Sequence, residues 1–158
     1  MNYNKSIWAI CILASTSPMT LVKAADNIDQ LREQSVVLIR SGEVEQGLKQ
    51  LRNLLAQQPK NQKLIADYIV SAYAHQKLTA SDLSCLQSIN VQNFPEYAWL
   101  SVVKGQRDLK QFVAAAKWAD IYYQQSQQQQ WLVWQGVLNA EAGQTTVAKQ
   151  KLAQIQKD

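Results

Sequence analysis

The feature that most constrains this chain is a repeat of about 34 residues. Two similar turns, Ser41-Gly42-Glu43-Val44 and Ala142-Gly143-Gln144-Thr145, each separate two segments with helical hydrophobic periodicity. Units that start fourteen residues before each glycine begin at Ile28 and Gln129, and the 101 residues between these starts are close to three periods. The sequence therefore divides into units near 28–61, 62–95, 96–128 and 129–158.

Equivalent positions of the four units carry the same kinds of side chain. Position four is always apolar, position twenty is always small, and position twenty-four is apolar and of varying size. In unit order these residues are Leu31, Ile65, Trp99 and Leu132; Gly47, Ser81, Ala115 and Ala148; and Leu51, Cys85, Ala119 and Leu152. Large residues opposite small ones let paired helices approach closely. Over residues 28–158 the pattern resembles the tetratricopeptide repeat family.

This resemblance implies an all-α fold, a right-handed superhelix (α-solenoid) of about four helix-turn-helix units. Two departures weaken the match: the family's proline appears only as Pro59, and no unit has the expected aromatic at position eleven. A helical bundle without repeats is the alternative. The expected helices are Ile28–Arg40 with Asn27 as N-cap, Glu43–Gln57, Gln62–His75, Ser81–Ile89, Pro95–Gln106, Leu109–Gln125, Gln129–Glu141 and Thr145–Ile155.

Residues 1–24 are typical of a secretory signal peptide, which leaves residues 25–158 as the repeat domain. Lys5 precedes an apolar segment, Ile7–Ala14, and Val22-Lys23-Ala24 fits a cleavage site. The apolar segment is too short to cross a membrane, which takes about 20 residues. An uncleaved anchor helix is the alternative. We expect export to a bacterial periplasm.

Charge and residue types exclude several functions. Residues 1–24 hold two lysines and no acidic residue, so their removal lowers the net charge from +4 to +2. This is too small a charge to predict nucleic acid as a partner. His75 is the only histidine, which excludes histidine-rich zinc sites, and no catalytic constellation is evident. We therefore expect no catalytic residue, no metal, no cofactor and no enzymatic activity.

Several conspicuous residues have structural interpretations. Cys85 occupies a helix-packing position and is expected to be a buried, inert thiol. His75 is expected to end a helix, where a cation is favoured. The glutamine-rich stretch 124–130 is expected to be a solvated connection between repeats. Tryptophans 99, 118, 131 and 134 could stack on sugar rings, but their helical spacing favours core packing.

Three short sequence segments indicate a more specific resemblance: Ile65-Ala66-Asp67-Tyr68, Phe94-Pro95-Glu96-Tyr97-Ala98 and Arg107-Asp108-Leu109-Lys110-Gln111-Phe112. Over residues 28–155 they resemble the periplasmic repeats of export porins for poly-β-1,6-N-acetyl-D-glucosamine. The resemblance implies a scaffold that binds the periplasmic polysaccharide deacetylase and guides partly deacetylated polymer to an outer-membrane barrel. Such a barrel would be linked in cis if the chain is part of a larger porin. The alternative is a separate periplasmic adaptor that binds a peptide or helix of an unrelated partner.

The tetratricopeptide resemblance also implies a binding groove, which the family forms from positions two, five, nine, twelve and thirteen of each unit. Transferred to this chain, the partner-binding residues are Arg32, Arg40, Lys63, Tyr73, Tyr97, Lys104 and Arg107. Asp29, Asp108 and Glu141 lie on the same face, which leaves five cations against three anions. A solvated face is the alternative. An acidic protein surface fits this charge better than a cationic, partly deacetylated polymer does.

The last expected helix has an apolar stripe formed by Val147, Ala148, Leu152 and Ile155. Part of this stripe should remain exposed, because stacked repeats bury one face against each neighbour. The sequence therefore predicts fraying or self-association at unit four, which a C-terminal extension would suppress.

Overall fold

The computed structural model describes residues 18–155, and this part of the chain is helical apart from its turns. Its α-helices are α1 (Pro18–Arg40), α2 (Val44–Gln57), α3 (Gln62–Ala74), α4 (Trp99–Asp108), α5 (Phe112–Ser126), α6 (Gln129–Glu141) and α7 (Thr145–Ile155). Three 3-10 helices, η1 (Asp82–Ser88), η2 (Val91–Asn93) and η3 (Glu96–Ala98), lie between α3 and α4. No strand occurs within residues 18–155, so the predicted all-α class is confirmed.

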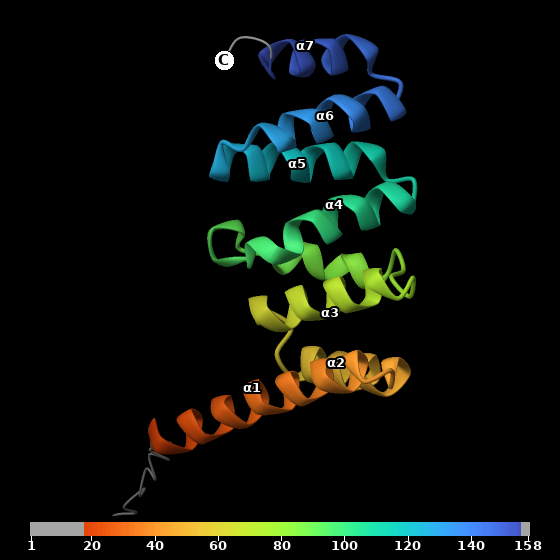
Figure 1. Ribbon diagram of the computed structural model, residues 1–158. Coiled ribbons are helices and arrows are strands. Elements are labelled where there is room, and N and C mark those ends of the chain that lie inside the picture. Colours follow the sequence, from red (N-terminus) through yellow and green to blue (C-terminus); the bar gives the residue numbers. More distant parts are fainter. Residues whose placement is uncertain (1–17, 156–158) are drawn as a thin grey trace, which may run out of the picture.

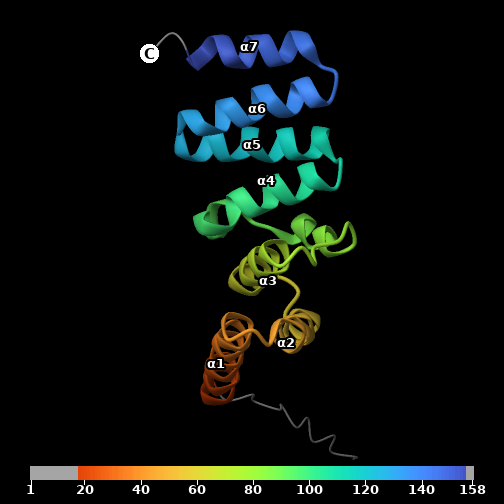
Figure 2. The same ribbon diagram turned by 45° about the vertical axis from the view of Figure 1, so that its right-hand side comes forward.

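The helices stack in chain order from α1 at one end to α7 at the other, and successive helices run back and forth (Figure 1). In the turned view of Figure 2, α1 and α2 are seen nearly end-on while α5, α6 and α7 still lie lengthwise. The helix direction therefore rotates along the stack. No helix within residues 18–155 is long and apolar enough to cross a membrane.

Glycines allow close packing where the first and last pairs of helices meet. A Cβ at Gly47 on α2 would lie 2.6 Å from the Ser35 carbonyl oxygen of α1. A Cβ at Gly136 on α6 would lie 2.6 Å from two carbons of Leu152 on α7. The turns between these helices contain Gly42, at φ 100°, and Gly143, at φ 76°, in the left-handed region that glycine adopts readily. These two pairs fit the predicted helix-turn-helix units.

Unit two departs from the prediction. The α-helix expected over Ser81–Ile89 is wrong, because the structure has the 3-10 helix η1 there, followed by η2. Local polar bonds favour this tighter turn: the Asp82 carboxylate accepts from the Thr79 backbone N–H at 2.9 Å, and Cys85 Sγ donates to the Asp82 carbonyl at 2.9 Å. Ser81, the small residue expected between two helices, is exposed.

Other helix boundaries also differ from the predictions. α1 begins at Pro18, so Asn27 lies within the helix and is not its N-cap. Pro95 has an extended backbone and precedes η3, so the helix predicted from Pro95 is split into η3 and α4. α5 begins at Phe112, three residues after the predicted start. The predicted helices Gln129–Glu141 and Thr145–Ile155 are confirmed without change.

The predicted signal peptide lies largely outside the described residues. Both Lys5 and the apolar segment 7–14 belong to this undescribed part, while the predicted cleavage site at residues 22–24 falls within α1. Cleavage after residue 24 therefore stays a prediction.

The buried side chains form two clusters along the stack. An aliphatic cluster joins α1, α2 and α3 around Leu48, Leu51 and Leu64. A second cluster extends from α3 to α6 and is rich in aromatic residues: the Trp99 ring stacks on that of Tyr122, with centroids 4.5 Å apart and planes 5° apart. The burial of Trp99 confirms its predicted core role. Trp131 is buried beside both rings, whereas Trp118 and Trp134 are only partly buried.

The large apolar residues at repeat positions four and twenty-four are buried, except for two that lie on the outermost described helices, α1 and α7. At position four, Ile65, Trp99 and Leu132 are buried, whereas Leu31 is 39% exposed on α1. At position twenty-four, Leu152 is 42% exposed on α7. The predicted exposure along α7 is therefore present at Leu152 and at Val147, while Ala148 is buried.

Candidate functional site

The candidate site is the surface formed by α1, α3, α4 and α6, together with Tyr97 of η3. We call it the first-helix face, because these elements supply positions two, five, nine, twelve and thirteen of the units. Four of the exposed large apolar side chains lie at these positions: Tyr97, Leu100, Val133 and Val137, which are 57%, 40%, 45% and 38% exposed. Exposed apolar side chains gathered on one face are a feature of interaction surfaces.

Asp67 joins the first three units on this face. Arg32 of α1 forms an ion pair with Asp67 of α3 through Nη1 and Oδ2, and Tyr97 donates its hydroxyl to Asp67 Oδ1 at 2.5 Å. Burial raises the pKa of Tyr97, and the hydrogen bond to Asp67 raises it further, so this hydroxyl stays protonated at neutral pH. Arg32 also contacts Asp29 at 3.3 Å and Glu33 at 3.4 Å. The Arg32 guanidinium is therefore already paired with carboxylates of its own chain.

A cavity of about 230 Å³ lies beside this cluster, between α1 and α3. Arg40, Asp67 and Tyr97 line it, together with Val36 and Val70. The Arg40 side chain has no ion pair within the described residues. Its charge is thus available to an acidic group that enters the cavity.

The other half of the face is organised around Trp134 of α6. Arg107 of α4 makes a two-pronged contact with Glu141 of α6, with Nε 3.0 and 2.8 Å from the two carboxylate oxygens. The Arg107 guanidinium and the Lys104 ammonium each lie 6.0 Å from the centre of the Trp134 ring. The hydrogen bond from Arg107 lowers the pKa of Glu141, which keeps the pair ionised.

Tyr73 lies between these two halves. It lines a hollow of about 310 Å³ with Leu78, Gly105 and Asp108. Burial raises the pKa of Tyr73, and the nearby Asp108 carboxylate raises it further. The Tyr73 hydroxyl is therefore a neutral group at the edge of the hollow.

The structure changes the charge predicted for this face. Asp67, which the position rule omits, adds a fourth anion, so the excess falls from two positive charges to one. Arg32 and Arg107 are occupied by Asp67 and Glu141, while Arg40, Lys63 and Lys104 have no ion pair within the described residues. Lys63 is exposed and lines none of the hollows described above.

The sequence predicts structural roles for Cys85, His75 and the glutamine-rich stretch 124–130. Burial raises the pKa of the Cys85 thiol to about 11, so it is protonated and a poor nucleophile at neutral pH. His75 is the C-cap of α3, as predicted. The stretch 124–130 connects repeats only at residues 127–128, because residues 124–126 end α5 and residues 129–130 begin α6. Within the described part of the chain, no group of three His, Cys, Asp or Glu residues is placed to hold a metal ion.

Sequence reasoning missed Asp67 as the centre of the face, and it missed the apolar strip of Leu100, Val133 and Val137. A signal for Asp67 exists in the repeat, since oppositely charged partners lie about one period apart: Arg32 and Asp67 are 35 residues apart, and Arg107 and Glu141 are 34 apart. No family model, curated protein or solved structure matches this chain.

Proposed function

We propose that this chain is a periplasmic protein-binding scaffold of the tetratricopeptide type, and that it serves an exopolysaccharide export system. In this proposal the first-helix face binds the polysaccharide deacetylase, upstream of an outer-membrane export pore. The resemblance of three short segments, Ile65–Tyr68, Phe94–Ala98 and Arg107–Phe112, to the repeats of export porins for poly-β-1,6-N-acetyl-D-glucosamine suggests this system. The apolar strip and the three cations without ion pairs on one face are the observation that carries the binding role.

The chemistry of the face favours a particular kind of partner segment. Leu100 lies one turn before Lys104 on α4, and the Arg107–Glu141 contact links the ends of α4 and α6, the helix that carries Val133 and Val137. An amphipathic helix with an apolar stripe and flanking carboxylates matches this arrangement. A partly deacetylated polymer is cationic and would be repelled by Arg40, Lys63 and Lys104. The proposed primary partner is therefore an acidic segment of a protein.

Isothermal titration calorimetry of the chain against the purified deacetylase tests this proposal. The double variant Arg40→Glu/Lys104→Glu reverses two cations that make no ion pair within the described residues, and far-UV circular dichroism of the variant checks that its fold is kept. We expect its Kd to rise at least about tenfold at low salt. Lys49→Glu and Lys149→Glu are matched controls, because both lysines are exposed on second helices.

Two results would contradict the proposal in different ways. Equal affinity of the double variant and the controls would move the binding site off the first-helix face. No binding to the deacetylase at all would remove the export role. In that case capture of an unrelated acidic helix, with the same sensitivity to Arg40 and Lys104, would favour the alternative of a separate periplasmic adaptor.

A further inference from the structure

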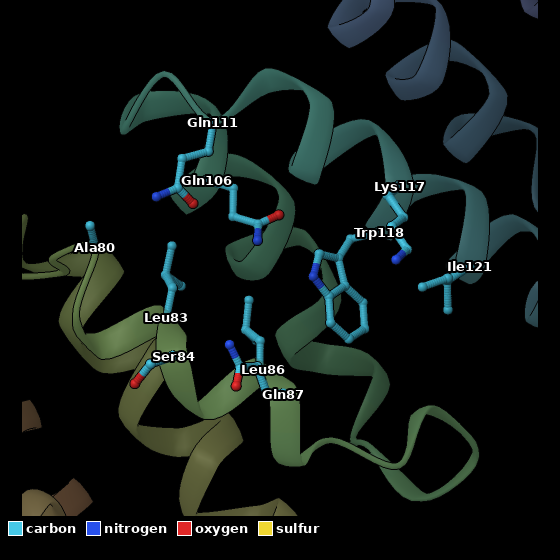
Figure 3. Close-up of a pocket in the computed structure, with 10 residues that line it drawn as sticks. All are labelled: Ala80, Leu83, Ser84, Leu86, Gln87, Gln106, Gln111, Lys117, Trp118 and Ile121. Carbon is cyan, nitrogen blue, oxygen red and sulfur yellow. The ribbon is translucent and has the colours of Figure 1, made fainter.

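A pocket of about 530 Å³ lies away from the first-helix face, where η1 takes the place of the second helix of unit two. Figure 3 shows η1 on one side of this pocket and α4 and α5 on the other. We call it the η1 pocket. Its volume is within the range of small-molecule sites, about 300–1,000 Å³. The irregular unit thus creates a concave surface that a regular helix pair would fill.

The walls of the η1 pocket combine apolar and neutral polar groups. Leu83 and Leu86 of η1 face Trp118 and Ile121 of α5 across it. Trp118 is only partly buried, so part of its indole ring is accessible from the pocket. Ser84, Gln87 and Gln111 add hydrogen-bonding groups around these apolar side chains. This combination suits a ligand that has one bulky apolar group next to polar atoms.

The Gln106 side chain of α4 lies in the middle of the lining residues (Figure 3). Gln106 is 5% exposed, and its Oε1 has no hydrogen-bond partner within the described chain. The Gln111 N–H donates to the Gln106 carbonyl at 2.8 Å, which satisfies the backbone oxygen but not the side-chain oxygen. A buried carbonyl oxygen without a partner is costly, and the N–H of a ligand amide offers the donor that it lacks.

The charge around the η1 pocket sets a third requirement for its ligand, an anionic group. Lys117 of α5 is exposed at its edge and has no ion pair within the described residues. None of the lining residues is acidic. An anionic group on the ligand would therefore meet an unopposed positive charge.

We propose that the η1 pocket binds an N-acylated apolar amino acid, either as a free molecule or as the C-terminal residue of a peptide. The apolar side chain packs between Trp118 and the leucines of η1. The amide pairs with the Gln106 carboxamide, and the carboxylate faces Lys117. This binding is independent of the function proposed for the first-helix face.

Titration of the full chain with N-acetyl-L-phenylalanine, followed in ¹⁵N–¹H NMR spectra, tests this proposal. We expect the Trp118 indole N–H signal to shift in a saturable way. Two analogues separate the ligand groups: N-acetyl-L-phenylalaninamide lacks the carboxylate, and 3-phenylpropionate lacks the amide. Each should bind at least about fivefold more weakly than N-acetyl-L-phenylalanine. The peptide Ala-Ala-Phe distinguishes a peptide C-terminus from a free N-acylated amino acid as the ligand. If it binds as tightly as N-acetyl-L-phenylalanine, the ligand is a peptide C-terminus. If it binds more weakly, the ligand is the free molecule.

Substitutions in the η1 pocket test which residue contacts each group of the ligand. Lys117→Gln should abolish the preference for the free carboxylate, whereas Lys149→Gln on α7 is the matched control and should leave the preference unchanged. Gln106→Leu keeps the side-chain volume and removes an unpaired polar group, so the fold should persist while the preference for the amide is lost. The proposal is overturned if the Trp118 signal does not shift up to about 10 mM ligand. It is also overturned if the analogues bind equally well.

Discussion

The first and second units of this chain connect their segments in contrasting ways. In unit one, α1 and α2 approach so closely at Gly47 that no side chain fits between them. In unit two, η1 is held against α3 by polar bonds: Tyr68 donates to Asp82 Oδ1 at 2.5 Å and accepts from Arg52 Nε at 2.6 Å. Small residues thus specify a helix pair, whereas a polar anchor can hold a short irregular segment in its place.

The largest expected effect concerns the close approach in unit one. Gly47→Ala places a Cβ 2.6 Å from the Ser35 carbonyl oxygen and 2.5 Å from Ile39 Cγ1, so the backbones must separate. We expect the free energy of unfolding to fall by about 2–3 kcal/mol. Gly136→Ala is the matched control, because its Cβ meets only the half-exposed Leu152 side chain, which can rotate. Its loss should stay below about 1 kcal/mol, since alanine favours helix.

Urea unfolding followed by far-UV circular dichroism measures both glycine variants. Equal losses for the two would show that the α1–α2 contact is no more constrained than the α6–α7 contact. The comparison between units one and two would then lose its physical basis.

A smaller effect is expected from the polar anchor of unit two. Tyr68→Phe removes a hydroxyl that links Arg52 of α2 to Asp82 of η1, which should cost about 1–2 kcal/mol. Because the link holds η1, hydrogen exchange should accelerate mainly in residues 82–88. Tyr123→Phe on α5 is the control, since the Tyr123 hydroxyl makes no hydrogen bond within the described chain. Unchanged exchange in η1 would mean that apolar contacts alone hold it.

The smallest effect is a dependence on pH. Burial tends to raise the pKa of Asp82, but hydrogen bonds from Tyr68 and Thr79 and the charge of Arg52 outweigh it and lower this pKa below its ordinary value of 3.8. A lowered pKa stabilises the fold above pH 4, and this contribution is lost as the pH falls through the native pKa. Asp82→Asn should therefore lose less stability than the unaltered chain between about pH 5 and pH 3.

The expected difference is about 0.5–1 kcal/mol, because solvent screens a carboxylate that is only partly buried. Urea midpoints at the two pH values provide the measurement, with Asp120→Asn on α5 as a control for a general loss of charge. A parallel decline of Asp82→Asn and the unaltered chain would assign acid sensitivity to other carboxylates.

The sequence predicted the regular units well and unit two poorly, for a physical reason. Helix pairs such as α6 and α7 are encoded locally, by apolar periodicity and a glycine in the turn, so their boundaries can be found from short segments. The form of η1 depends on Tyr68 and Arg52, which lie 14 and 30 residues before Asp82. No local pattern can reveal such contacts.

The candidate site, too, was predicted where it depends on local sequence and was missed where it depends on contacts between units. The position rule placed Arg40 and Lys104 on the first-helix face, because the helical phase of each unit sets its exposed residues. It missed the role of Asp67, whose importance comes from contacts with the units before and after its own. Pairs of opposite charge separated by one repeat would have indicated these contacts, as they would for Arg107 and Glu141.

The stacked rings of Trp99 and Tyr122 belong to a group of aromatic side chains that reports spectroscopically on only part of the molecule. Within residues 18–155, every tryptophan lies at or beyond residue 99, so intrinsic fluorescence reports on α4, α5 and α6, whereas far-UV dichroism reports on all helices. The parallel aromatic pair should also give a strong near-UV dichroic band that vanishes when these helices separate. Fluorescence would therefore change little while α1 and α2 unfold, because α3 packs in the same cluster as Trp99. Coincident optical transitions would show that the aliphatic and aromatic clusters unfold as one cooperative body.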